Sequence, residues 1–216
     1  MKKTALLLIV VLSCFALLFA ACSSQAPEAP ANNAAEPPAE ATVVTGITVF
    51  QTAVAGLQTV DVAGVAAYPI ADFLAAAYET APSGNIVLVA TDGYMASSTM
   101  EDLANYAITL EGGEAPLVVG DESLPGELKV KYLDYIVAGN EVIYFASADI
   151  SAADLLTKVQ MGEAASYAFT AADGFSKSAA ADTFTNVIIS SADGTVNVTL
   201  PEMPAPMRDL VRIAAE

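Results

Sequence analysis

The chain of 216 residues has no histidine and no tryptophan, only two cysteines, and 8 basic residues against 25 acidic ones. Without histidine it cannot carry a histidine general base, a Ser–His–Asp or Cys–His catalytic set, or a histidine-ligated zinc or haem site. A formal net charge of −17 argues against nucleic acid as a partner, because such binding needs clustered basic residues. The composition therefore favours a role other than catalysis.

Residues 1–21 have the pattern of an export signal. Lys2 and Lys3 give a positive start, and an almost unbroken apolar stretch follows from Thr4 to Ala21. Cys22 stands where the apolar stretch gives way to a polar segment. The pattern predicts export of the rest of the chain. A transmembrane anchor is the alternative, since a stretch of this length could just span a bilayer.

The residues around Cys22 resemble the lipobox of bacterial lipoproteins, with the sequence LLFAACSS over residues 17–24. The resemblance implies cleavage before Cys22, lipidation of Cys22, and attachment to membrane lipid on the extracytoplasmic side, at the cell surface or in the periplasm. Phe19 departs from the leucine that is usual in the family. Cys14 would leave with the signal, so the mature chain would have no disulfide and no free thiol.

The segment after Cys22 is dominated by proline, alanine and glutamate up to Ala41 and shows no apolar periodicity. Residues 22–41 are therefore expected to form the lipidated cysteine and a disordered tether.

A weak internal repeat with an offset of 81 residues relates the two halves of the remaining chain. The segment ATDGY at 90–94 aligns with AADGF at 171–175, and matched Gly, Asn and Pro positions follow. The repeat predicts a first module over residues 42–138 and a second over residues 139–216.

Hydrophobic periodicity predicts strands, one main helix and a hairpin in the same order in both halves. The strands expected in the first half cover 43–50, 58–65, 85–90 and 128–137, with a helix after Pro69 and a short helix capped by Thr99. In the second half we expect a helix capped by Ser151, strands over 141–145, 167–170 and 210–214, and a short helix over 179–184. The expected fold class is α+β, with two tandem modules, each having a mixed, mainly antiparallel sheet and short helices.

The repeated Asp-Gly-aromatic segment is the best candidate for a ligand site, because it follows an apolar strand and leads toward an expected helix start. Free N–H groups of such a loop and helix terminus can hold an anion. The candidate ligand-binding residues are Asp92, Gly93, Tyr94, Ser97, Ser98, Thr99, Asp173, Gly174, Phe175, Ser176 and Ser178. The alternative is a structural turn, in which Asp caps its own backbone, Gly takes a positive φ and the aromatic residue packs in the core.

Four segments, at 68–74, 87–94, 115–119 and 130–136, resemble the sulfite-oxidase-type molybdopterin-binding domain. The resemblance covers about residues 58–137 and, more faintly, 140–214. Catalytic members hold molybdenum through a cysteine thiolate and contact the pterin phosphate through His and Arg. This chain has no histidine, and its two arginines are Arg208 and Arg212 near the C-terminus. The resemblance therefore implies the fold without the molybdenum cofactor and without the enzyme.

Residues 92–99 also resemble, more loosely, the sites at which exported flavoproteins carry FMN on a Thr or Ser through a phosphoester. The implied attachment residues are Thr99, Ser98 or Ser178. The sequence thus favours a membrane-anchored, non-catalytic binding lipoprotein without cofactor or metal, whose ligand is a small molecule or an envelope protein. A redox lipoprotein carrying FMN and a purely structural envelope protein are the two alternatives.

Overall fold

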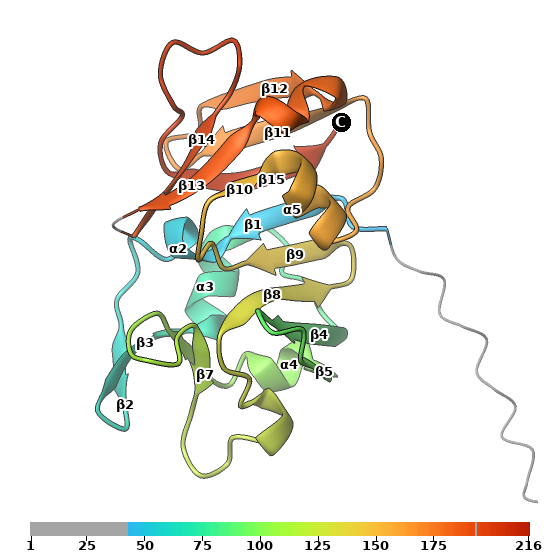
Figure 1. The fold of residues 1–216 in the computed structure, drawn as a ribbon. Coiled ribbons are helices and arrows are strands. Elements are labelled where there is room, and N and C mark those ends of the chain that lie inside the picture. The colour runs from blue at the N-terminus through green and yellow to red at the C-terminus, as the bar shows by residue number, and fades with distance from the viewer. Residues whose placement is uncertain (1–42, 193) are drawn as a thin grey trace, which may run out of the picture. The chain divides into compact units, whose positions relative to one another are not determined.

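An eight-stranded sheet organises residues 43–192 and 194–216, which are the residues that the computed structural model describes (Figure 1). β1 and β9 pair in parallel, and the other neighbouring strands pair antiparallel. The expected α+β class with a mixed, mainly antiparallel sheet is confirmed. In order across the sheet the strands are β12 (Ser176–Ala180), β11 (Ser166–Ala171), β15 (Leu210–Ala215), β1 (Gly46–Val49), β9 (Glu141–Tyr144), β8 (Leu133–Ala138), β4 (Asn85–Ala90) and β5 (Met95–Thr99).

Two smaller sheets and short helices complete the described part, which belongs to one compact unit. The expected export signal, Cys22 and the expected tether lie outside the described residues. The smaller sheets contain β2 (Val60–Val62), β3 (Val65–Pro69), β6 (Ala107–Thr109) and β7 (Leu117–Val119), and β10 (Ile150–Ser151), β13 (Ile188–Ala192) and β14 (Thr195–Thr199). The helices are α2 (Phe50–Ala53), α3 (Ile70–Ala77), α4 (Met100–Leu103), α5 (Ala152–Lys158) and the 3-10 helices η1 (Gly126–Leu128) and η2 (Ala181–Asn186).

The two helix caps expected from the sequence are confirmed. The Thr99 hydroxyl accepts a hydrogen bond from the Asp102 N–H at 3.1 Å and begins α4. The Ser151 hydroxyl accepts one from the Asp154 N–H at 3.0 Å and begins α5. Each hydroxyl satisfies an N–H group that the helix itself leaves without a partner.

Several expected element boundaries are wrong, and each has a local reason. The strand expected over 58–65 is the β2–β3 hairpin, because Ala63 and Gly64 both take positive φ. The strand expected from residue 128 begins only at Leu133, since η1 and the positive φ of Tyr132 (52°) interrupt extended backbone. The helix expected over 179–184 is a 3-10 helix that begins at Ala181 after β12.

The offset of 81 residues holds for the two hairpins that form the edges of the eight-stranded sheet. Ile86 pairs with Ser98 in the β4–β5 hairpin, and Tyr167 pairs with Ala179 in the β11–β12 hairpin. A register shift follows Val89 in one half and Thr170 in the other. Strand pairing, turn and bulge therefore recur at matched positions.

The central strands belong to both halves of the chain, and successive side chains of β9 enter different cores. Val142 and Tyr144 pack in a core that includes α5, whereas Ile143 and Phe145 pack in a core that includes α3. Because neighbouring side chains of a strand point to opposite faces, the two cores lie on opposite faces of the sheet. β1, from the first half, lies between β9 and β15. The boundary expected at 138/139 falls in the turn between the paired strands β8 and β9.

Candidate functional site

Both Asp-Gly-aromatic segments are hairpin turns. Asp92 Oδ1 accepts a hydrogen bond from the Tyr94 N–H, and Asp173 Oδ1 accepts one from the Phe175 N–H, both at 2.9 Å. Gly93 and Gly174 have the same positive φ of 86°. These contacts are those of a structural turn, except that Tyr94 is 57% exposed and Phe175 49% exposed instead of packing in the core.

The two turns do not come together. The pairing of the strands makes β4 and β11 run in the same direction, so that both turns lie at the same end of the sheet. Their hairpins, however, form its two opposite edges, with four strands between β11 and β4. At about 4.8 Å per strand the edge strands are on the order of 30 Å apart. The expectation that both turns line one ligand site is therefore wrong.

The hydroxyl residues expected beside the turns are placed on strands. Ser97 and Ser98 belong to β5, which separates the first turn from α4. The Thr99 hydroxyl donates to Asp102 Oδ2 at 2.8 Å besides accepting the capping bond. Ser178 lies within β12 and does not begin a helix, because Ala180 precedes η2 without a side-chain cap. The N–H groups of turn and helix therefore do not converge on one anion.

Ser176 lies closest to the second turn but is also engaged within its hairpin. Its hydroxyl donates to the Phe169 carbonyl at 3.3 Å and lies 3.1 Å from the Thr170 hydroxyl. Beside this turn there is a shallow cavity of about 290 Å³, bounded by Asp173, Phe175 and Arg208. Of the two turns predicted as ligand sites, the second is therefore the better candidate, because a cavity lies beside it.

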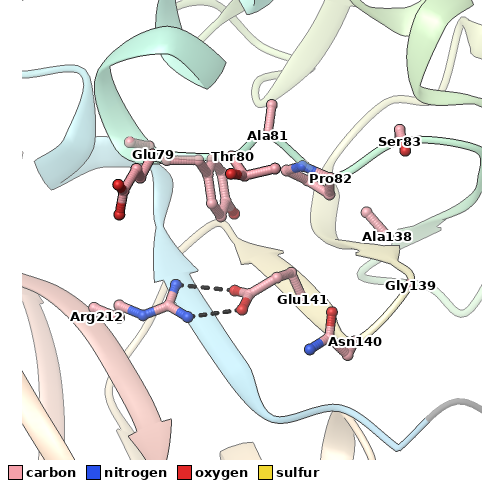
Figure 2. A pocket seen from close by; sticks show the side chains of 12 residues that line it. Glu79, Thr80, Ala81, Pro82, Ser83, Ala138, Gly139, Asn140, Glu141 and Arg212 are labelled. Carbon is pink, nitrogen blue, oxygen red and sulfur yellow. Dashed lines mark hydrogen bonds and ion pairs between the residues drawn. The ribbon is translucent and has the colours of Figure 1, made fainter.

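A cleft of about 630 Å³ next to the end of α3 is the strongest candidate site, and we call it the polar cleft (Figure 2). Residues 77–83 line one side of the cleft, and the β8–β9 turn lines the opposite side together with Glu141 and Arg212; we call the part formed by these two residues the floor. Figure 2 shows the 79–83 segment facing Glu141 and Arg212 across the cleft. The residues around the polar cleft are Ala77, Tyr78, Glu79, Thr80, Ala81, Pro82, Ser83, Ala138, Gly139, Asn140, Glu141 and Arg212.

A bidentate ion pair between Arg212 and Glu141 forms the floor of the polar cleft. Arg212 Nη2 lies 2.7 Å from Glu141 Oε1, and Arg212 Nη1 lies 2.9 Å from Glu141 Oε2. Arg212 Nη1 also donates to the Thr48 hydroxyl at 3.2 Å. The hydrogen bonds to Glu141 raise the pKa of Arg212, so the pair stays ionised.

Gly46 makes the ion pair possible, because Glu141 and Arg212 come from strands on either side of β1. A Cβ atom at position 46 would lie 2.5 Å from both Arg212 Nη2 and Glu141 Oε1. That distance is too short for non-bonded atoms. Any other residue at position 46 would push the ends of these two side chains away from their present positions.

Tyr78 follows α3 and places a buried hydroxyl at the polar cleft. Its ring packs edge-on against Phe73, with centroids 6.0 Å apart. Burial raises the pKa of Tyr78 to about 12, an effect that the neighbouring Thr48 hydroxyl partly offsets. No described residue meets the geometry of a hydrogen bond to the Tyr78 hydroxyl. The hydroxyl is shut off from solvent and faces Thr48, so a molecule in the polar cleft would contact the rest of the Tyr78 residue and not this atom.

Glu79 adds an unpaired carboxylate to the rim. It is exposed and forms no ion pair with any residue of 43–192 or 194–216. Glu79 and Glu141 against Arg212 leave the polar cleft with an excess of one negative charge. The polar cleft therefore combines acceptors on its rim with guanidinium donors on its floor.

The corresponding position of the second half has a different character. A groove of about 310 Å³ lies next to the end of α5, over Val87, Val89 and Val137. Its one cation, Lys158, pairs with the buried Asp134 at 2.5 Å. Burial first, and then the Asp134 charge, raise the pKa of Tyr144 to about 12. Two related positions of a repeated fold thus differ in polarity.

Sequence reasoning missed the polar cleft. Its residues come from positions 46, 78–79, 140–141 and 212, which no local pattern connects. The one available signal was Arg212, since an arginine inside an apolar strand needs a partner. That partner cannot be identified until the order of the strands is known.

Comparisons with known proteins give no match to a family model, a curated protein or a solved structure. Across residues 43–192 and 194–216, no helix is long and apolar enough to cross a membrane. The same residues contain no group of three or more His, Cys, Asp or Glu side chains placed to hold a metal ion.

Proposed function

We propose that this protein is a membrane-anchored extracytoplasmic lipoprotein that acts as a non-catalytic binding module, with its ligand in the polar cleft. The anchor rests on the lipobox-like residues that end at Cys22. The binding role rests on the polar cleft itself, in which a fixed ion pair and an exposed carboxylate, Glu79, border about 630 Å³. Binding sites commonly have this size and a few convergent polar groups.

The groups in the polar cleft support binding better than catalysis. With its pKa near 12, Tyr78 keeps its proton at neutral pH and cannot act as a base there. Both carboxylate oxygens of Glu141 are held by Arg212. Neither group is placed to move a proton.

The fold is proposed to be a degenerate form of the sulfite-oxidase-type molybdopterin-binding domain. In support, the DG-aromatic turn stands at the end of β4 and of β11, where the resemblance expects it. The side chains present do not fit the cofactor itself. The chain from residue 23 onward has no cysteine to hold molybdenum, and Arg212 is already paired with Glu141.

Two measurements test this proposal. The first compares the intact mass and detergent-phase partitioning of the full chain with those of Cys22→Ser; only the parent chain is expected to carry lipid. The second screens metabolites by thermal shift against the parent chain, Glu79→Gln in the polar cleft, and Glu122→Gln, an exposed control outside the cleft. A ligand whose shift is lost only in Glu79→Gln supports the binding role. If no metabolite gives a shift that depends on the polar cleft, a structural envelope protein becomes the better account.

A further inference from the structure

We infer that the ligand of the polar cleft is a small amine that also carries a hydrogen-bond acceptor, such as an amino acid or a short peptide of neutral or positive charge. This inference rests on the proposed binding function and goes further by naming the ligand class. It follows from where the polar cleft has free acceptors and where it has free donors.

The rim supplies the acceptors. The Glu79 carboxylate has no ion-pair partner among the described residues. The Asn140 amide nitrogen donates to the Thr45 hydroxyl at 2.9 Å, and this bond turns the amide oxygen away from Thr45. A carboxylate and an amide oxygen are natural partners for an ammonium group, which has three donors and no acceptor.

The floor supplies the donors. Three N–H groups of Arg212 are used by Glu141 and Thr48. Within the described residues, nothing accepts from its Nε–H or from the second Nη2 hydrogen. A guanidinium with free N–H groups binds a carbonyl or carboxylate oxygen well.

Charge decides between the ligands that such groups could bind. The polar cleft carries an excess of one negative charge, and the chain as a whole carries −17. Both repel a ligand that is negative overall and attract one that is positive. An acceptor-bearing ammonium compound satisfies both sets of groups and the charge, whereas a phosphate or a dicarboxylate satisfies only the donors.

The test is calorimetric titration of the full chain, in detergent, with L-lysine, L-alanine, L-glutamate and glucose. We expect lysine to bind best, alanine more weakly, and glutamate at least about tenfold more weakly than lysine, since its charge is opposed. Glu79→Gln is expected to weaken lysine binding about tenfold by removing a charged partner, and Glu122→Gln to leave it unchanged.

Three outcomes overturn the inference. Glucose or glutamate binding more tightly than lysine, in a manner that depends on Glu79 or Arg212, would reject the amine while keeping the polar cleft as a binding site. Lysine binding that is equal in the parent chain, Glu79→Gln and Arg212→Gln would place the ligand elsewhere and reject the proposed site as well. If neither L-lysine nor L-alanine binds, the amine class is rejected.

Discussion

Replacing Gly46 with alanine is expected to destabilise the protein, because the new methyl group would occupy the space in which Arg212 meets Glu141. The added Cβ would lie 2.5 Å from an atom of each partner. The pair must then separate or move away from β1. Both partners are only partly shielded, with side-chain exposures of 35% for Arg212 and 14% for Glu141.

The size of the effect follows from two opposing contributions. Breaking a fully buried ion pair costs about 3–5 kcal/mol, whereas a surface pair contributes about 0–1 kcal/mol, so this partly shielded pair should cost about 2–3 kcal/mol. Exchanging glycine for alanine within a strand ordinarily gains about 0.5–1 kcal/mol. Because the contacting atoms are the ends of flexible side chains, the net loss in the free energy of unfolding, measured by urea titration, is expected to be at most about 1–2.5 kcal/mol.

The matched control is Gly56→Ala, since a Cβ at position 56 would meet no heavy atom within 4 Å. We also expect the loss at Gly46 to disappear when Glu141 and Arg212 are both replaced by leucine, because the added methyl group would then have no ion pair to separate. If Gly46→Ala and Gly56→Ala have equal stabilities, the reasoning about the ion pair is refuted.

Three further predictions concern the shared sheet, the buried tyrosines and the ion pair. We expect neither of two separately produced segments, residues 43–138 and residues 139–216, to unfold cooperatively by circular dichroism, because β1 of the first lies between β9 and β15 of the second. Mixing the two segments should restore a cooperative transition. Two independent transitions would contradict this expectation. Tyr78 and Tyr144, with pKa values of about 12, should still be un-ionised near pH 11 in an absorbance titration. Their contribution to the free energy of unfolding should be complete below about pH 10 and be lost as the pH rises toward about 12. If Tyr78→Phe leaves the loss of stability over this pH range unchanged, Tyr78 is excluded as a cause of it. Replacing Glu141 and Arg212 together by leucine should change stability by less than about 1 kcal/mol while abolishing binding in the polar cleft.

Local features were predictable because residues near one another in the sequence produce them. The caps at Thr99 and Ser151 and the hairpin turns at Gly93 and Gly174 depend on side chains and backbone within four residues. The offset of 81 residues also carried over into strand register. A short sequence pattern is therefore sufficient to predict the helix caps and the hairpin turns at these positions.

The order of the strands was not predictable in the same way. β1 lies between β9 and β15, which come more than ninety residues later in the chain, so no pattern within one module indicates that pairing. The ligand site expected at the two turns failed for this reason, because their hairpins lie at opposite edges of the sheet. The polar cleft was missed for the same reason, since it exists only where β1 brings Glu141 and Arg212 together.

The difference between the two related positions argues that the polar cleft has a role beyond stability. At the end of α5 the fold packs Val87, Val89 and Val137 against a groove, so apolar side chains suit this position of the repeat. Replacing a shielded ion pair by well-packed apolar residues is often neutral or stabilising, and the pair itself is therefore a weak source of stability. The polar cleft nevertheless has an ion pair, a glycine beside it, and an exposed carboxylate, that of Glu79, on its rim. This contrast between the two positions supports the proposal that a molecule binds in the polar cleft.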